Sequence, residues 1–408
     1  MARSLYICYF GLREPLVQTQ VLPYLRELLK GGHELSLLTF EREVIALSDA
    51  DKLRAELAEQ GIAWHRLKYH KRLSAIATMW DVLQGVRFIR KFVARERPDL
   101  LHGRVHVPTL MAVIARKFSR HKPKILFDIR GFFPEEYTDA GVWPEGGVLY
   151  RIAKRVERSL LRHSDGFVVL TERAREILFP ESRETGFDRR GRPVEVIPCC
   201  VDMYRFAFAG PETRAAVRAE LGVAARYVMA YVGAFGGWYL TQETADLFGV
   251  LKSHRPDAFA LILTQSPRDM IEPLLTKSGY LPGDYFIAKV APAEIPRFLS
   301  GADIAVSFIK RCYSKQASSP TKNAEYLACG LPVIVNSGIG DTDRQIGGAK
   351  IGAVTDGFTP DELFSAIRAV ESLDRPTDRC REFAQGNFDL EAVGGKRYRR
   401  IYERLLNK

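Results

Sequence analysis

The fold is most restricted by a repeated alternation of short apolar strands with amphipathic helices. The chain begins with the strand-like run LYICYF, the helical run VLPYLRELLKGG and a second strand, HELSLLTF. Similar apolar runs recur in both halves, among them KILFDIR, GFVVLT, RYVMAYVG, FALILTQ and LPVIV. Strands that alternate with helices form parallel sheets with helices on both faces. The pattern therefore predicts an α/β protein with doubly wound sheets.

The length indicates two domains, because a chain of 408 residues is too long to form a single ordinary hydrophobic core. Its content of 46% hydrophobic and 27% charged residues is typical of a soluble globular protein. A strand ends at Pro198 within IPCCVDMYRF, and polar, Gly-containing sequence follows. We therefore predict a first domain over residues 1–203, a second over 204–388 and a final helical segment over 389–408.

The cysteines and the apolar runs indicate the cellular compartment in which the protein is expected. The six cysteines form no CxxC pair, so they are expected to be buried thiols in a reducing environment. No run of about eighteen uncharged apolar residues occurs, and the N-terminus does not resemble an export signal. We expect a cytoplasmic protein without a membrane-spanning helix.

The segment SSPTKNAEYLACGLPVI, residues 318–334, predicts an anion site. Ser318 or Ser319 can cap a helix in which Pro320 is the first residue, and the helix stops at Gly330. The N–H groups at such a helix start favour an anion such as a diphosphate, with the Thr321 hydroxyl, Lys322 in the first turn and Glu325 one turn later. A buried carboxylate there needs a partner such as ribose hydroxyls. The alternative is an ordinary helix followed by a strand.

The same segment resembles the donor-site signature of the GT-B glycosyltransferases of family 4. In that signature, two glutamates separated by seven residues precede a strand of the form GxPVI. Glu325 matches the second glutamate, which holds the nucleotide ribose, whereas Ala317 stands in place of the first. The resemblance implies two Rossmann-like domains facing a cleft, with the nucleotide-sugar on the second domain and the acceptor on the first. It also implies that segment 389–408 crosses back to the first domain.

The run YVGAFGGWY, residues 231–239, resembles the family's Gly-rich turn beside the donor diphosphate. The family's Arg and Lys are replaced here by Ala234 and Tyr239. Lys322 is then the first candidate to neutralise the leaving diphosphate, with Arg13, Arg130, Lys310, Arg311 and Lys315 in reserve. A simple strand-to-helix connection is the alternative. The predicted donor residues of this turn are Gly233, Gly236, Gly237, Trp238 and Tyr239.

Two further segments complete the predicted sites. In YFIAKV, the resemblance assigns base recognition to Ala288, Lys289 and Val290; the alternative for Lys289 is a solvated strand end. In KILFDIRGF, Asp128 and Arg130 stand where the family has a Thr-x-His motif, and they are assigned as catalytic together with Lys322. The alternative there is a structural salt bridge. The remaining acceptor or phosphate candidates are Gly11, Arg13, Gln18 and Arg104.

Positive charge is concentrated in residues 66–124, which contain fifteen Lys and Arg and three acidic residues. Within this basic segment, Ile76, Met79, Trp80, Leu83 and Val86 follow helical spacing. Such a pattern most often marks a helix packed on a sheet with a solvated basic face. It also fits a surface that rests on anionic lipid. No nucleic-acid motif accompanies it, so nucleic acid is not expected.

Together these features predict a retaining, metal-independent glycosyltransferase. The donor would be a nucleotide-diphospho-sugar, and the acceptor a lipid-linked saccharide or other cell-surface glycan precursor at the inner face of the cytoplasmic membrane. The run Asp341–Asp343, DTD, is interpreted as a polar turn and not as a metal motif. No metal or other cofactor is expected. The alternatives are a sugar-nucleotide epimerase of the same fold and a catalytically degenerate nucleotide-sugar-binding or membrane-surface protein.

Overall fold

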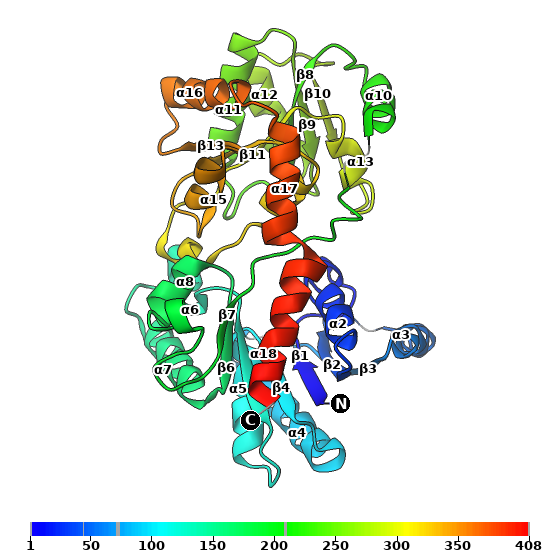
Figure 1. Ribbon diagram of the computed structural model, residues 1–408, viewed down its shortest axis with the longest axis vertical. Helices are drawn as coiled ribbons and strands as arrows, with labels where there is room; N and C mark the ends of the chain where they lie inside the picture. The colour runs from blue at the N-terminus through cyan, green and yellow to red at the C-terminus, as the bar shows by residue number, and fades with distance from the viewer. Residues whose placement is uncertain (1, 44, 71–73, 208–209, 407–408) are drawn as a thin grey trace. The chain divides into compact units, whose positions relative to one another are not determined.

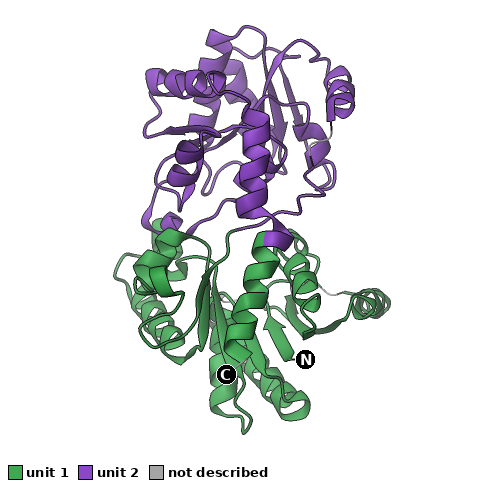
Figure 2. Ribbon diagram, in the orientation of Figure 1, with its two compact units in different colours: residues 1–198, 393–408 green, residues 199–392 purple. Residues whose placement is uncertain are grey.

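The computed structural model describes the chain except residues 1, 44, 71–73, 208–209 and 407–408. It divides into two compact units, which Figure 2 shows in separate colours. The first unit contains residues 1–198 and 393–408, and the second contains residues 199–392. The chain leaves the first unit after its last strand and returns through the π-helical turn η3, Leu390–Gly395 (Figure 1).

The first unit is built on a seven-stranded parallel sheet in the order β3-β2-β1-β4-β5-β6-β7. The strands are β1 Arg3–Ile7, β2 Glu34–Glu41, β3 Ile62–Lys68, β4 Leu100–Arg104, β5 Lys124–Ile129, β6 Gly166–Val169 and β7 Val194–Val196. The helices are α1 Pro15–Gln20, α2 Leu22–Leu29, α3 Leu47–Glu59, α4 Ser74–Glu96, α5 His106–Lys117, α6 Phe133–Asp139, α7 Val148–His163, α8 Glu172–Leu178, α9 Ser182–Thr185 and α18 Lys396–Leu406.

The second unit is built on a six-stranded parallel sheet in the order β10-β9-β8-β11-β12-β13. The strands are β8 Tyr227–Val232, β9 Ala258–Leu263, β10 Tyr285–Ala288, β11 Ile304–Ser307, β12 Val333–Asn336 and β13 Gly352–Thr355. The helices are α10 Gly210–Glu220, α11 Thr241–His254, η1 Arg268–Met270, α12 Glu272–Lys277, α13 Ile295–Leu299, η2 Tyr313–Ala317, α14 Thr321–Ala328, α15 Thr342–Ala349, α16 Pro360–Glu371 and α17 Pro376–Phe388.

Both sheets are covered by helices, which confirms the predicted doubly wound α/β fold. In β8, Val228 and Ala230 belong to the hydrophobic core on one face of the sheet, whereas Met229 and Tyr231 belong to the core on the other. This alternation follows from the two-residue period of a strand. The strand order reverses between β1 and β4 in the first sheet and between β8 and β11 in the second. Ligands in open α/β sheets bind beyond the carboxyl ends of the strands at such a point.

The last helix, α18, completes the core of the first unit. Tyr398 and Tyr402 are each no more than 1% exposed. The Tyr402 hydroxyl lies 2.9 Å from His102 Nδ1, and Arg399 donates to the Glu27 carboxylate at 2.9 Å. Residues separated by about 300 positions in sequence therefore form one core, so the first unit needs both ends of the chain.

The basic segment differs from the sequence-based expectation. Four of its five apolar residues, Ile76, Met79, Trp80 and Leu83, are 50–62% exposed, and only Val86 packs in the core. Interpretation of these four as a sheet-packing face is wrong, because α4 packs through another face that includes Val82, Ile89 and Val93. Lys71 and Arg72 are two of the fifteen basic residues counted in this segment, and they lie outside the described residues.

Within the described part of the chain, none of the helices combines the length and the apolar character that crossing a bilayer requires.

Candidate functional site

Helix α14 begins without a side-chain cap. Its first residue is Thr321, and Pro320 takes the N-cap position with extended backbone. The prediction that Ser318 or Ser319 caps the helix, with Pro320 as its first residue, is therefore wrong. The Ser319 hydroxyl instead accepts a hydrogen bond from the Cys199 N–H at 3.1 Å. A helix start whose N–H groups lack a side-chain partner is suited to an anion.

Lys322 places a buried ammonium group in the first turn of α14. The residue is 8% exposed, and its Nζ lies 4.5 Å from the centre of the Tyr231 ring and 3.9 Å from that of Tyr239. Among the described residues, Nζ has no hydrogen-bond partner. Burial lowers the pKa of Lys322 to about 7, and the nearby Glu325 acts in the opposite direction. An anion at this position would satisfy donors that the protein leaves unused.

The Gly-rich turn after β8 lies against this ammonium group. Gly233 has φ 138°, and a Cβ atom built on it would lie 3.0 Å from Lys322 Nζ. The two segments are far apart in sequence, but β8 and β11 are neighbours in the sheet, and the carboxyl ends of parallel strands share one edge. Gly236 and Gly237 also have positive φ, 80° and 62°. The structure therefore brings Gly233, the first of the predicted glycines, and Lys322 together.

The ammonium groups of two lysines lie over aromatic rings of this turn. Lys315 is 6% exposed, and its Nζ lies 3.8 Å from the centre of the Trp238 ring, while Lys322 stands over Tyr239. The contact with Tyr239 holds the Lys322 ammonium without consuming its N–H donors. The turn itself lacks the Arg and Lys of the resembled family, and Lys315 and Lys322 supply two positive charges beside it. The sequence predicts Lys315 only as a reserve candidate for neutralising the leaving diphosphate.

We expect Gly233→Ala to disturb this arrangement more than Gly237→Ala. Both positions have positive φ, which costs a non-glycine residue about 1–2 kcal/mol in the left-handed region. At Gly237 nothing lies within 4 Å of the added Cβ, whereas at Gly233 the Cβ meets the Lys322 ammonium. Urea unfolding should show a larger loss of stability for Gly233→Ala, and calorimetry a larger loss of nucleoside-diphosphate affinity. Equal behaviour of the two variants would argue against a Lys322 ammonium beside the turn.

Glu325 lies one turn further along α14 and is partly buried. Burial raises its pKa to about 7, and the positive charges of Arg205 and Lys322 act in the opposite direction. A partly buried carboxylate of this kind is suited to accept hydrogen bonds from hydroxyl groups, as the sequence predicted for a ribose. Arg205 was missed, because an arginine in a polar connecting segment does not differ by pattern from a solvated one.

The predicted base-recognition residues lie at the end of β10, an edge strand of the second sheet. The Ala288 carbonyl accepts the Thr264 N–H at 3.0 Å, and the Val290 carbonyl accepts from Gln265 Nε2 at 3.4 Å. Lys289 is exposed. These carbonyl oxygens already have partners within the protein, and base recognition at this strand stays a prediction.

In the first unit, Asp128 is fully buried at the carboxyl end of β5. Its Oδ2 accepts from the Tyr398 hydroxyl at 2.9 Å, and Arg130 Nη1 lies 3.8 Å from Oδ1. Burial opposes ionisation, but Arg130, His102 and Arg104 outweigh it and hold the pKa of Asp128 at about 2. A carboxylate that is inaccessible and so weakly basic is suited to position its neighbours. The catalytic role that the sequence suggested for Asp128 and Arg130 stays a prediction.

The loop after β1 uses its backbone donors within the protein. The Gly11 N–H donates to Glu14 Oε1 at 2.9 Å, and the Leu12 N–H donates to the Glu41 carboxylate at 3.0 Å. The Arg13 guanidinium pairs with Asp49 at 3.3 Å. Gln18 Nε2 donates to the Leu12 carbonyl at 2.7 Å. The hydrogen-bonding groups of the predicted phosphate loop are thus satisfied within the protein. Arg104 lies at the end of β4, the strand that pairs with β1.

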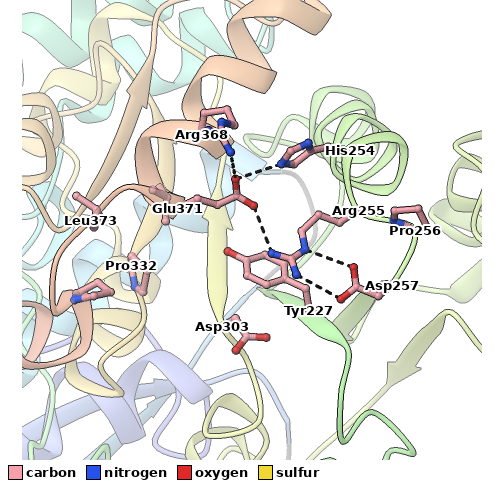
Figure 3. Close-up of a pocket in the computed structure, with 12 residues that line it drawn as sticks. Tyr227, His254, Arg255, Pro256, Asp257, Asp303, Pro332, Arg368, Glu371 and Leu373 are labelled. Carbon is pink, nitrogen blue, oxygen red and sulfur yellow. Dashed lines mark hydrogen bonds and ion pairs between the residues drawn. The ribbon is translucent and has the colours of Figure 1, made fainter.

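A cavity of about 600 Å³ lies elsewhere in the second unit, at the amino ends of β8 and β11 (Figure 3). Its charged residues pair with one another: Glu371 contacts His254 at 3.1 Å and Arg368 at 3.2 Å, and Arg255 contacts Asp257 at 3.3 Å. Ligands of such sheets bind at the opposite edge. We therefore assign these groups to the stability of the unit.

The carboxylates of the DTD run have local partners. Asp343 accepts the Gly338 N–H at 3.1 Å, and Asp341 lies 3.6 Å from the Arg344 guanidinium. Among the described residues, no group of three or more His, Cys, Asp or Glu side chains is placed to hold a metal ion.

Comparison with known proteins identifies the fold. Residues 17–200 match the family described as "Glycosyl transferase 4-like domain". The whole chain superposes on a glycosyltransferase from Rickettsia africae with a TM-score of 0.74, 16% identity and coverage of 100% and 99% of the two chains. The corresponding values are 0.72, 15% and 100% of both chains for sucrose-phosphate synthase from Thermosynechococcus elongatus. They are 0.67, 16% and 100% of both for Anabaena HepE in complex with UDP and glucose. None of the curated proteins compared is similar enough to count as a match.

The fold is therefore that of the GT-B glycosyltransferases. The similarity to the glycosyl transferase 4-like family covers residues 17–200, a little under half of the chain.

Proposed function

We propose that this chain transfers a sugar from a nucleotide-diphospho-sugar to an acceptor hydroxyl, with the donor on the second unit. The observation that carries the proposal is the buried Lys322 ammonium, which has no hydrogen-bond partner among the described residues and lies at the uncapped start of α14. A Cβ atom at Gly233 would lie 3.0 Å from this ammonium, so Lys322 lies directly against the glycine backbone that the donor diphosphate would approach. The complex of HepE with UDP and glucose supports this class of donor.

In this proposal the protein's own charges replace a metal ion. A departing diphosphate needs positive charge in a water-poor environment, where preorganised donors are most effective. Lys315 and Lys322 beside the turn, together with the helix N-terminus, provide that charge. We propose that the transfer retains the configuration of the sugar, and that the leaving phosphate accepts the acceptor proton. This part rests on the resemblance to family 4.

The first experiment is a calorimetric titration of the protein with UDP, GDP, ADP, dTDP and CMP, with and without magnesium. We expect one nucleoside diphosphate to bind selectively without metal and to identify the sugar-nucleotide class for transfer assays. Binding followed by transfer to an acceptor would support the enzyme. Binding with an intact donor would favour the degenerate binding protein, release of a modified free sugar nucleotide would favour an epimerase, and binding of none would overturn the donor site.

We further propose that the acceptor is lipid-linked and that the protein rests on the cytoplasmic face of a membrane. The support is one continuous exposed face of α4. Ile76, Met79, Trp80 and Leu83 form its apolar half, and the exposed cations Arg87, Arg90 and Lys91 continue the same face by helical spacing. A basic helix with an exposed apolar face fits the boundary between anionic headgroups and acyl chains. Val142, Val148, Leu149 and Ile152, before and within α7, are a second exposed apolar set.

We expect the double variant Trp80→Ser, Leu83→Ser to bind vesicles of anionic phospholipid at least about tenfold more weakly than the native chain. Each apolar side chain that loses burial forfeits about 1.5–3 kcal/mol. The effect is measured by vesicle co-sedimentation at low and high salt. The electrostatic attraction between the basic half of the face and the anionic lipid should weaken as the salt concentration rises. The control is Leu281→Ser, which removes a 66% exposed leucine from the second unit. Unchanged sedimentation, or dimerisation lost in the double variant, would contradict a lipid partner.

A further inference from the structure

An incompletely paired charge cluster lies at the carboxyl ends of β4 and β5 in the first unit. Arg104 is 4% exposed, the Arg130 side chain is 7% exposed and Asp128 is fully buried. Burial lowers the pKa of His102, and the neighbouring Asp128 acts in the opposite direction. Arg104 and Arg130 both lie beside this one buried carboxylate, and Arg130 also donates to the Tyr398 hydroxyl at 3.5 Å and to the Gln20 amide oxygen at 3.4 Å.

The distances within the cluster are longer than those of a closed salt bridge. Arg104 Nη1 lies 3.6 Å from Asp128 Oδ2, and Arg130 Nη1 lies 3.8 Å from Oδ1, whereas charge-assisted hydrogen bonds are about 2.7–2.9 Å long. Among the described residues, Arg104 Nε and Nη1 and Asp128 Oδ1 have no hydrogen-bond partner. Leaving buried charged donors unsatisfied is costly. A purely structural ion pair does not account for this geometry.

The turn that follows Arg104 supports a binding role. Val105 has φ 69°, which is a true outlier for a β-branched residue, and such strain is concentrated at functional sites. Val105 is also the N-cap of the twelve-residue helix α5, which has no side-chain cap. The uncapped N-terminus of α5 thus adjoins a buried arginine with unused donors, at the point where the strand order reverses between β1 and β4.

We infer that Arg104, Arg130 and the N-terminus of α5 form a binding site for a phosphate-like anion, and that the acceptor of the proposed transfer carries such a group. Asp128 and Tyr398 hold the guanidinium groups in place, and the ligand accepts hydrogen bonds from the unused Arg104 donors. The part that concerns the acceptor rests on the proposed function; the anion site itself does not. All of its residues belong to the first unit, whereas the proposed donor residues belong to the second.

The anion site is tested with inorganic phosphate and pyrophosphate as probes, by calorimetry and by the shift in melting temperature. We expect phosphate binding to survive in Lys322→Met, to weaken at least about tenfold in Arg104→Gln and to be largely retained in Arg104→Lys. Arg173→Gln, which changes an exposed arginine of the same unit, is the control. Arg104→Gln should still bind the nucleoside diphosphate within about twofold, which also shows that it folds. Phosphate binding that is equal in Arg104→Gln, or lost only in Lys322→Met, would overturn the site and mark the anion as a donor phosphate.

The source of the anion is decided by inhibition. Once transfer is established, phosphate should compete with the acceptor and not with the sugar nucleotide. Competition with the sugar nucleotide would assign Arg104 and Arg130 to the donor diphosphate and overturn the acceptor part. Absence of transfer with intact phosphate binding would overturn the proposed function and leave the anion site standing, so the two proposals fail separately.

Discussion

Replacing Lys322 by methionine is expected to lower the rate of sugar transfer by about 10²–10³-fold, the usual effect of removing one preorganised charge-stabilising donor. The side chains have similar length, so the packing against Tyr231 and Tyr239 is largely kept while the charge is lost. Nucleoside-diphosphate affinity should fall less than the rate, because charge on the leaving group is greater in the transition state than in the bound donor.

The measurement compares kcat and KM with the calorimetric Kd for the same protein. Lys277→Met, which removes an exposed lysine of α12, serves as the control for net charge. If Lys322→Met reduced affinity and rate equally, Lys322 would bind the donor without assisting its departure. Transfer at the native rate would show that Lys315 or another group supplies the charge.

Replacing Glu325 by glutamine is expected to weaken nucleoside-diphosphate binding by about 10–100-fold. Hydrogen bonds to charged groups are worth about 1.5–3 kcal/mol, and each 1.4 kcal/mol is a factor of ten in Kd. The decisive comparison uses a nucleotide without the ribose hydroxyls. Native protein should lose affinity for the deoxy nucleotide, whereas Glu325→Gln should lose little more.

The control for this change is Glu382→Gln, at an exposed position of α17. Additive losses from the substitution and from the missing hydroxyls would show that Glu325 does not contact the ribose. An unchanged Kd would place the nucleotide elsewhere.

The variants Lys322→Met and Glu325→Gln should also differ in the direction in which their nucleoside-diphosphate affinity changes with pH. Lys322, with a pKa near 7, is protonated below that pH, so its contribution to anion binding is lost as the pH rises. Glu325, also near 7, ionises above that pH, so its contribution as an acceptor grows as the pH rises. Affinity should therefore fall with pH between 6 and 8 in Glu325→Gln and rise in Lys322→Met. Parallel slopes would contradict the assignment of the two groups.

Much of the fold could be predicted from the sequence, because strand and helix periods are local properties. The alternation of apolar strands and helices predicts both parallel sheets, and Gly330, with φ 79°, follows the end of α14 as expected of a helix-stopping glycine. The start of α14 was predicted one residue too early, since the sequence does not show that the Ser319 hydroxyl would bond to a distant N–H.

The charges around the site were harder to predict, because they depend on which strands are neighbours. The contact of Lys322 with the Gly233 turn requires β8 and β11 to be adjacent. The exposed apolar half of α4 shows the same limit: helical spacing identifies a face, but only the tertiary structure decides whether another element covers it. Arg104 appeared in the sequence as one weak candidate, and its unsatisfied donors become visible only when β4 and β5 are paired.

The completion of the first unit by α18 has a consequence for synthesis on the ribosome. Residues 1–198 leave the ribosome before the second unit, but Tyr398 and Tyr402 are made only after it. The second unit is continuous in sequence and can close its core as soon as it has emerged. The unit that is begun first is thus finished last, and until then its sheet lacks α18, which exposes it to chaperones and proteases for the time needed to make some two hundred further residues.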